Sequence, residues 1–300
     1  MTTMNWQDAL SEFGLDFQVE KRPVRALISA GESTEIPNLY GIVRTDTMQP
    51  LSGVGVNERY RCIQTQSYAD IGNAICGGLG AEFVNGGVFR DGKMVYLQAK
   101  LPDVIRIRDT DDVLEKLLTF VTSHDGTLAF MLMPLAWRIF CSNQKNALNR
   151  EARDGIKIRH TRAAEGRLDA ADEKILEVMN AYRAFEVKCN FLADSAFNDI
   201  QMHAAMRRAF NVSDEKADED IPTRTQDNMD VVLTNFASGS GIDAGNRGTA
   251  WAAYNALTEY ADHQRKTNQG TDRFENNLLG TGAGFKHRAL KAVEDILAGR

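Results

Sequence analysis

The hydrophobic pattern of this sequence changes near its middle, and that change limits the folds open to the chain. Between residues 83 and 140, short apolar or alternating runs are separated by two Asp-Gly pairs, Asp91-Gly92 and Asp125-Gly126. Asp-Gly between such runs is a strong hairpin signal, because both residues tolerate the backbone of a tight turn. After residue 143, apolar residues recur at steps of three and four, which is typical of helices. The sequence therefore predicts an α+β protein, with a hairpin-rich antiparallel sheet in the N-terminal half and a helical C-terminal half.

Other strand signals lie around these hairpins. Residues 17–28 are extended in pattern, and Pro23 favours an edge strand or a loop there. Residues 40–45 indicate a strand, and residues 54–63 indicate the strand that returns beside it.

The apolar runs beside the second Asp-Gly pair are less regular. Residues 114–122 fit a strand, or a helix that bends into one. Residues 127–140 contain Pro134, which cannot donate a ladder hydrogen bond, so we expect a bulge or a strand break at that point.

Helical spacing predicts a series of helices joined by loops. We expect helices over residues 5–13, 66–79, 165–192, 198–210, 227–236, 249–260 and 285–300. We expect loops at the acidic stretch 213–222 and at two glycine-rich stretches, 238–248 and 280–284. Neither glycine-rich stretch follows a predicted strand, so we interpret them as helix connections rather than phosphate-binding loops.

Length and composition allow one large or two small domains, since the chain has 300 residues and is 43% hydrophobic. We divide it into residues 1–163, a mixed hairpin and helix region, and residues 164–300, a helical region; the two can pack as one domain. No signal peptide or membrane-spanning run is recognisable. The four cysteines are widely spaced, as in reduced thiols. We therefore expect a cytoplasmic protein.

One basic segment stands out in a chain whose formal net charge is −6. Residues 138–167 contain eight lysines and arginines against three acidic residues. Such a segment can collect a polyanion, although a solvated helix face with internal pairs such as Arg150 with Asp154 is the simpler alternative. The nucleic-acid-binding candidates are Arg138, Asn143, Lys145, Asn146, Arg150, Lys157, Arg159 and His160.

Other candidate sites are weaker. The five histidines show no close metal-ligand spacing, and whether His124, His160 and His263 converge stays open. The adjacent residues Ser123, His124 and Asp125 fit a turn better than a catalytic triad, whose groups must converge in space. Cys141 with His160 fits a buried thiol better than a nucleophile with its base. We expect no catalytic residue, no metal site and no cofactor, and we favour a non-enzymatic role.

Several strings of residues together resemble one known family. They are Val54-Gly55-Val56, Ser123-His124-Asp125-Gly126-Thr127, Arg138-Ile139-Phe140-Cys141-Ser142-Asn143, Arg159-His160-Thr161, Gly248-Thr249-Ala250-Trp251, Asn255-Ala256-Leu257-Thr258-Glu259-Tyr260, Asp262-His263 and Gly280-Thr281-Gly282. The set resembles the uncharacterised phage/plasmid-like proteins of domain of unknown function nine-three-two. The resemblance implies a mobile genetic element as context and supplies no catalytic residues.

Two functional hypotheses follow. The first is a single-stranded nucleic-acid-binding protein that acts in phage or plasmid DNA replication, annealing or recombination. The alternative is a non-enzymatic protein-interaction module, such as an inhibitor of host defence, whose partner is a host protein. Neither involves a membrane, and homo-oligomerisation stays open.

Overall fold

The computed structural model describes residues 4–51, 55–138, 144–145, 171–239, 244–267, 270 and 272–300. The chain divides into two compact units, each assembled from separate stretches. Unit 1 comprises Met1–Pro102, Leu117–Met133 and Ala152–Met179, and unit 2 comprises Asp103–Lys116, Pro134–Glu151 and Asn180–Arg300. The boundary predicted between residues 163 and 164 lies outside the described residues.

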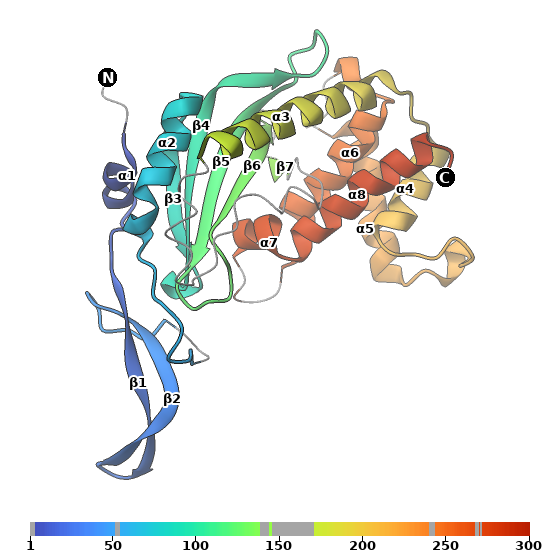
Figure 1. Cartoon of the computed structure of the whole chain (residues 1–300). Coiled ribbons are helices and arrows are strands. Elements are labelled where there is room, and N and C mark those ends of the chain that lie inside the picture. Colours follow the sequence, from blue (N-terminus) through green and yellow to red (C-terminus); the bar gives the residue numbers. More distant parts are fainter. Residues whose placement is uncertain are drawn as a thin grey trace. The chain divides into compact units, whose positions relative to one another are not determined.

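The strands form two antiparallel sheets, which confirms the predicted fold class (Figure 1). The first sheet is the hairpin of β1 (Val19–Ser29) and β2 (Glu32–Arg44). The second has five strands in the order β3-β4-β5-β6-β7. Its strands are β3 (Glu82–Phe89), β4 (Met94–Arg106), β5 (Val113–Ser123), β6 (Met131–Arg138) and β7 (Gln144–Lys145).

Both predicted Asp-Gly turns join the expected strands. Asp91 and Gly92 have φ values of 57° and 89° and connect β3 to β4. Gly126, with φ of 77°, lies in the connection from β5 to β6. The open choice for residues 114–122 is settled in favour of a strand, and β6 runs through Pro134 without the expected break.

The core of unit 1 is built around one tryptophan. The first helix, α1 (Trp6–Glu12), begins at a capping box of Asn5 and Asp8. Trp6 is 1% exposed, and its ring lies edge-on to Phe120 with a centroid distance of 5.1 Å. Its indole N–H donates to the carbonyl of Thr65 at 3.1 Å, so the one polar atom of the ring is satisfied.

Two further helices belong wholly or partly to unit 1. A 3₁₀ turn (Thr65–Tyr68) leads into α2 (Ala69–Leu79), which ends at Gly80 in the left-handed conformation. The long helix α3 (Ala171–Asp194) begins in unit 1 and continues in unit 2. The predicted apolar stripe of α3 is confirmed in Val178, Tyr182, Phe185, Cys189 and Leu192, all of which are buried.

The part of unit 2 that follows α3 is helical, as predicted (Figure 1). Its helices are α4 (Asp199–Ala209), α5 (Thr223–Ser238), α6 (Ala250–Glu259), a π-helical turn (Tyr260–Gln264), α7 (Arg273–Leu279) and α8 (Thr281–Leu297). Thr249 caps α6 by accepting a hydrogen bond from the backbone N–H of Ala252, which confirms the predicted start of that helix. Trp251 and Tyr254 of α6 have no exposed surface and lie at the centre of this unit.

Two local predictions were wrong. Residues 57–63 form no strand, and the return beside β2 is a single bridge between Tyr40 and Val56. Residues 281–284 are not a loop but the first turn of α8. A Cβ at Gly282 would lie 2.2 Å from the side-chain oxygen of Asn277, so this glycine permits close packing of α7 and α8 rather than a turn.

No helix in the described part of the chain combines the length and the apolar character that crossing a membrane requires.

Candidate nucleic-acid interface

The structure places only two of the eight candidate binding residues. Arg138 ends β6, and Lys145 lies in β7, where its backbone pairs with Ala136 of β6. The other six, Asn143, Asn146, Arg150, Lys157, Arg159 and His160, lie outside the described residues.

Arg138 does not belong to a nucleic-acid surface, which corrects the sequence-based prediction. The residue is 1% exposed. Its Nε donates to Oδ1 of Asp112 at 2.5 Å and its Nη2 to Oδ2 at 2.6 Å. A guanidinium that is enclosed and bonded in this two-point manner cannot reach a phosphate. No sequence signal reveals this burial, because an arginine at the end of an apolar strand fits either a buried or an exposed position.

Asp112 is the centre of a buried polar cluster within unit 2. Besides Arg138, the indole N–H of Trp251 donates to its Oδ2 at 2.7 Å, and the amide of Asn246 donates at 3.4 Å. The Asp112 side chain has no exposed surface, so these donors replace the water that a carboxylate otherwise needs. The cluster joins β6, the β4–β5 connection and the start of α6.

The β4–β5 connection has a shape that positions Asp112. Thr110 donates its hydroxyl to the carbonyl of Ile107 at 2.6 Å, and the N–H of Ile107 donates to the carbonyl of Asp112 at 3.0 Å. Arg108, between them, has φ of 55°, which is uncommon for a residue with a side chain. A tight loop of this kind turns the chain sharply enough to aim Asp112 inward.

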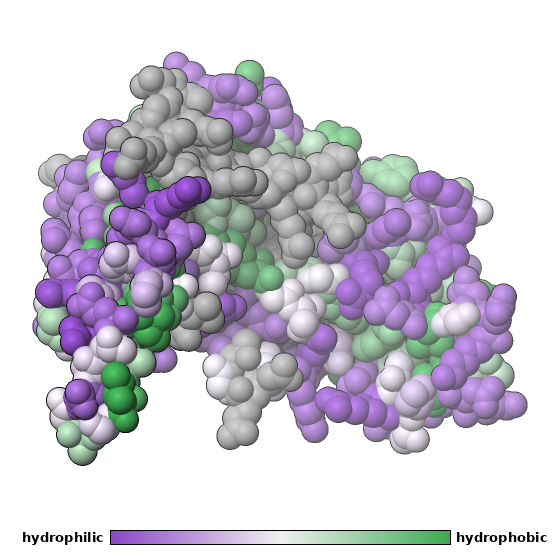
Figure 2. Space-filling view, turned by 60° about the horizontal axis from the view of Figure 1, so that its bottom comes forward, coloured by the Kyte–Doolittle hydropathy of each residue, from purple (hydrophilic) through white to green (hydrophobic). Residues whose placement is uncertain are grey.

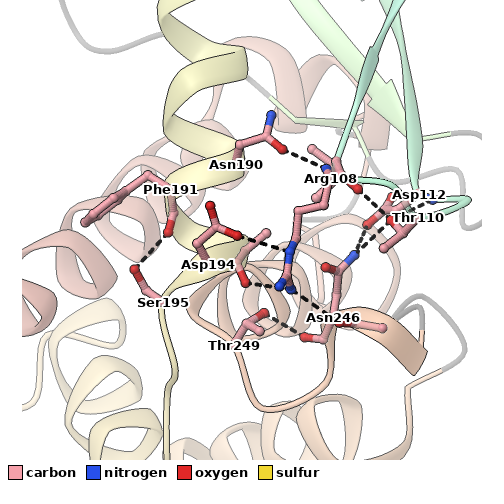
Figure 3. Close-up of polar contacts among 12 residues, drawn as sticks. Arg108, Thr110, Asp112, Asn190, Phe191, Asp194, Ser195, Asn246 and Thr249 are labelled. Carbon is pink, nitrogen blue, oxygen red and sulfur yellow. Dashed lines mark hydrogen bonds and ion pairs between the residues drawn. The ribbon is translucent and has the colours of Figure 1, made fainter.

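Arg108 attaches this loop to the C-terminal end of α3 (Figure 3). Its backbone N–H donates to Oδ1 of Asn190 at 2.7 Å, its Nη1 donates to the carbonyl of Ala193 at 3.1 Å, and its Nε lies 3.1 Å from Asp194. A cation beside the last carbonyls of a helix offsets the negative end of the helix dipole. Arg108 is therefore a positioning residue for α3, and its side chain is already engaged.

Two of these contacts lie on either side of the basic segment along the chain. Arg138, at the end of β6, pairs with Asp112, and Arg108 pairs with Asp194 at the end of α3. Six of the eight candidate residues lie in the sequence between Arg138 and α3, outside the described residues.

A second buried ion pair lies among the helices of unit 2. Lys286 of α8 is fully buried, and its Nζ donates to Oδ1 of Asp262 at 2.8 Å. Burial lowers the pKa of Lys286, and the Asp262 carboxylate opposes that effect. Asp262 lies in the π-helical turn, a feature that often marks a functional site. Here the turn aims the carboxylate at a lysine in the helical core, which is a packing role.

The turn interpretation of Ser123, His124 and Asp125 agrees with the geometry of unit 1. Ser123 Oγ donates to the carbonyl of Leu128 at 3.0 Å, and Asp125 accepts from the backbone N–H of Thr127 at 3.0 Å. His124 is 1% exposed and its Nε2 lies 3.4 Å from Oγ1 of Thr65. The three side chains thus face different partners and do not form a triad.

The other sites considered from sequence are partly outside the described residues. Cys141 and His160 are among those outside, and His263 is exposed on the π-helical turn. Within the described ranges, no three side chains of histidine, cysteine, aspartate or glutamate are grouped so that they could hold a metal ion.

Comparison with known proteins identifies the family. The family model described as Domain of unknown function (DUF932) matches residues 54–279. The chain belongs to this family. The match includes the five-stranded sheet, the Asp112 cluster and Asp262, and it ends before Lys286, the partner of Asp262. No curated protein and no solved structure matches the chain.

Proposed function

We propose that this DUF932 protein is a cytoplasmic, non-enzymatic protein that binds single-stranded nucleic acid during replication, annealing or recombination of phage or plasmid DNA. The observation that carries the proposal is the basic segment of a chain whose net charge is −6. Its link to mobile elements rests on the resemblance to phage/plasmid-like proteins.

The burial of Arg138 reduces the charge available to this proposal but does not remove it. Residues 144–167 still hold seven lysines and arginines against three acidic residues, a balance of +4. A local positive field of this kind attracts phosphates even when the whole molecule is acidic. Asn146 and Asn143 add donors that suit phosphate or base edges.

Two cations close to the segment in the sequence or the fold are accounted for within unit 2. Arg138 and Arg108 pair with carboxylates of the same unit, Asp112 and Asp194. The proposal therefore assigns phosphate contact to the cations of residues 144–167 and not to these two arginines.

Binding to a labelled oligothymidylate, followed by fluorescence anisotropy over a range of salt concentrations, tests the proposal. Affinity should fall steeply with salt, because counterions are released when phosphates are contacted. Lys157→Ala/Arg159→Ala should weaken binding and reduce the slope of log affinity against log salt by about 1.4, since each lost contact to a single strand removes about 0.7.

The matched control removes two cations elsewhere. Arg183 and Lys266 are exposed, so Arg183→Ala/Lys266→Ala lowers the net charge equally and should leave the affinity and the salt slope close to wild type. Lack of binding by the wild-type protein at low salt refutes the proposal. Equal losses in both double variants show that only net charge matters and refute the assignment to this segment.

A protein-interaction module is the second candidate function, and one observation favours it. Helix α3 leaves four large apolar side chains exposed along its length: Leu176 at 56%, Met179 at 38%, Val187 at 70% and Phe191 at 57%. Exposed apolar residues in a row on one helix suit a protein partner better than a phosphate backbone. Recovery of a stoichiometric host protein that survives nuclease treatment and is lost in Val187→Asp/Phe191→Asp would support this candidate.

A further inference from the structure

The distal half of the β1–β2 hairpin is exposed on both of its faces. Residues 29–38 are all classed as exposed, and Leu27 and Ile28 near the turn are 77% and 64% exposed. Figure 2 shows hydrophobic, green atoms at the surface of the narrow projection at the lower left, which corresponds to this hairpin in Figure 1. Large apolar side chains at that exposure are unusual for a strand that has no partner.

The register gives this half of the hairpin one apolar face. Ala26 pairs with Thr34, and Arg25 pairs with Glu35, so the residues of even number share one side as far as the register shift between Leu27 and Ser29. Val24, Ala26 and Ile36 lie on that side with Thr34, and every one of them is apolar or β-branched. The opposite side is mixed, because it carries Arg25 and Glu35 together with Leu27, which pairs with Ser33.

A two-stranded hairpin has little stability of its own. In water it is marginally stable, and a third strand or a covering layer is needed to stabilise it. Each strand of this hairpin also has an outer edge of backbone groups that could accept another strand. Among the strands that the structure describes, none pairs with the outer edge of β1 or of distal β2, and a strand added there would extend the apolar side as well.

Charge selects the strand that fits. Within residues 24–29, β1 carries Arg25 and no acidic residue, whereas the distal part of β2 carries Glu32 and Glu35 and no cation. Pairing β1 with a second β1, or β2 with a second β2, would set like charges against each other, which is unfavourable. Pairing β1 of one copy with β2 of another sets Arg25 against glutamates.

The ion pairs within one copy leave the charged side chains of the hairpin available for pairing with another copy. Arg22 with Glu20 and Arg25 with Glu35 have side chains that are 39% to 58% exposed. Exposed pairs are weak, so they can be shared with or exchanged for a neighbour at little cost.

We infer that a second copy of this chain is the partner of the hairpin, with β1 of one copy adding to β2 of the next. Such a contact uses two different surfaces of each copy, so it is head-to-tail and produces a closed ring or a filament rather than a two-fold dimer. Pro23 and the register shift after it interrupt β1, which confines the added strand to residues 24–29. This inference does not depend on nucleic-acid binding.

Two charge-reversed variants of the full-length protein test the inference without nucleic acid. Arg22→Glu/Arg25→Glu makes β1 acidic, and Glu32→Lys/Glu35→Lys makes β2 basic. Mass is measured by light scattering coupled to gel filtration, at increasing protein concentration. Wild type should form species larger than a dimer, each variant alone should be monomeric, and an equimolar mixture should regain the large species because acidic β1 then meets basic β2.

Controls separate this contact from misfolding and from general charge effects. Circular dichroism and thermal unfolding of each variant report whether it folds, and recovery in the mixture can come only from folded chains. Arg183→Glu, on exposed α3, should leave the assembly unchanged. A wild-type protein that stays monomeric at its highest soluble concentration, or that stops at a dimer, overturns the inference. So does assembly that survives in either variant alone.

Discussion

Arg138 and Asp112 meet through two hydrogen bonds, 2.5 Å and 2.6 Å long, at a place where both side chains are almost fully enclosed. Sequence reasoning grouped Arg138 with surface cations, whereas this contact makes it a buried structural residue. The contact also fixes the last residue of β6 directly before the chain enters the basic segment. The pair is thus a buried structural contact and not part of an exposed cationic surface.

Removal of Asp112 should cost far more stability than removal of an exposed partner. Asp112→Ala leaves the Arg138 guanidinium buried without a counter-charge, and we expect a loss of about 3–5 kcal/mol in the free energy of unfolding. Urea unfolding measures it. Glu35→Ala, which breaks the exposed pair with Arg25, is the control and should cost no more than about 1 kcal/mol. Equal losses in the two variants would contradict the importance of burial here.

A double substitution separates the charge from the packing at the same place. Asp112→Leu/Arg138→Met removes both charges together, and a buried pair replaced by apolar residues is often neutral or stabilising. The Trp251 indole and the Asn246 amide would still lose their acceptor. We therefore expect the double variant to unfold at higher urea than Asp112→Ala but below wild type. A double variant that is no more stable than Asp112→Ala would contradict the view that the unpaired Arg138 charge dominates the loss in Asp112→Ala.

Two glycines of α2 should respond to alanine in opposite directions. A Cβ at Gly72 would lie 2.0 Å from the Trp6 ring, whereas a Cβ at Gly77 would have open space around it. Gly72→Ala should therefore destabilise unit 1 by roughly 1–3 kcal/mol through overpacking. Gly77→Ala should stabilise the helix by up to about 1 kcal/mol, because alanine is the better helix former. Thermal unfolding of the two variants checks this, and a shift of the same sign in both would refute it.

The architecture was largely predictable because it follows from local signals. Both Asp-Gly turns, the apolar strands beside them and the stripe of α3 are encoded within short windows of sequence. The errors arose where a distant contact decides the structure. Gly282 lies in a helix because α7 packs against it closely, and no pattern in residues 280–284 reveals that neighbour.

The polar core could be predicted much less well for the same reason. Asp112 lies 134 residues before Asn246 and 139 residues before Trp251 in the sequence. The three residues meet only when the β4–β5 loop and the start of α6 are assembled beside β6. Arg138 and Trp251 each stood in a string that resembles the family, but neither string indicated that the two residues share Asp112 as a partner. Lys286 was similarly hidden, because a lysine in an amphipathic helix is normally exposed.

Alkaline pH should weaken the fold through the thiol of Cys76. Burial raises the pKa of the Cys76 thiol to about 12, whereas in the unfolded chain the thiol has its ordinary pKa of 9.0. The folded state thus holds its proton more tightly, so this contribution is complete below pH 9 and is lost as pH rises toward 12. Between pH 8 and 10.5, wild type should lose about 1–2 kcal/mol more than Cys76→Ala, as measured by urea unfolding. Parallel pH profiles would rule this thiol out as the cause.

Arg207 should control the order of the acidic stretch that the sequence suggested was a solvated loop. This arginine is 8% exposed, pairs with Asp218, and donates to the carbonyls of Ser213, at 2.5 Å, and Lys216. Hydrogen bonds to charged groups contribute about 1.5–3 kcal/mol each. Arg207→Met should therefore raise the locally open population, and the rate of tryptic cleavage after Lys216, by about 10-fold or more, since 1.4 kcal/mol corresponds to a factor of ten.

The neighbouring Arg208 provides the control, because it donates instead to the carbonyl of Arg300 at 2.7 Å. Arg208→Met removes one tryptic site as well and should leave cleavage after Lys216 unchanged. Similar cleavage rates in the two variants would mean that the stretch is held by contacts other than those of Arg207.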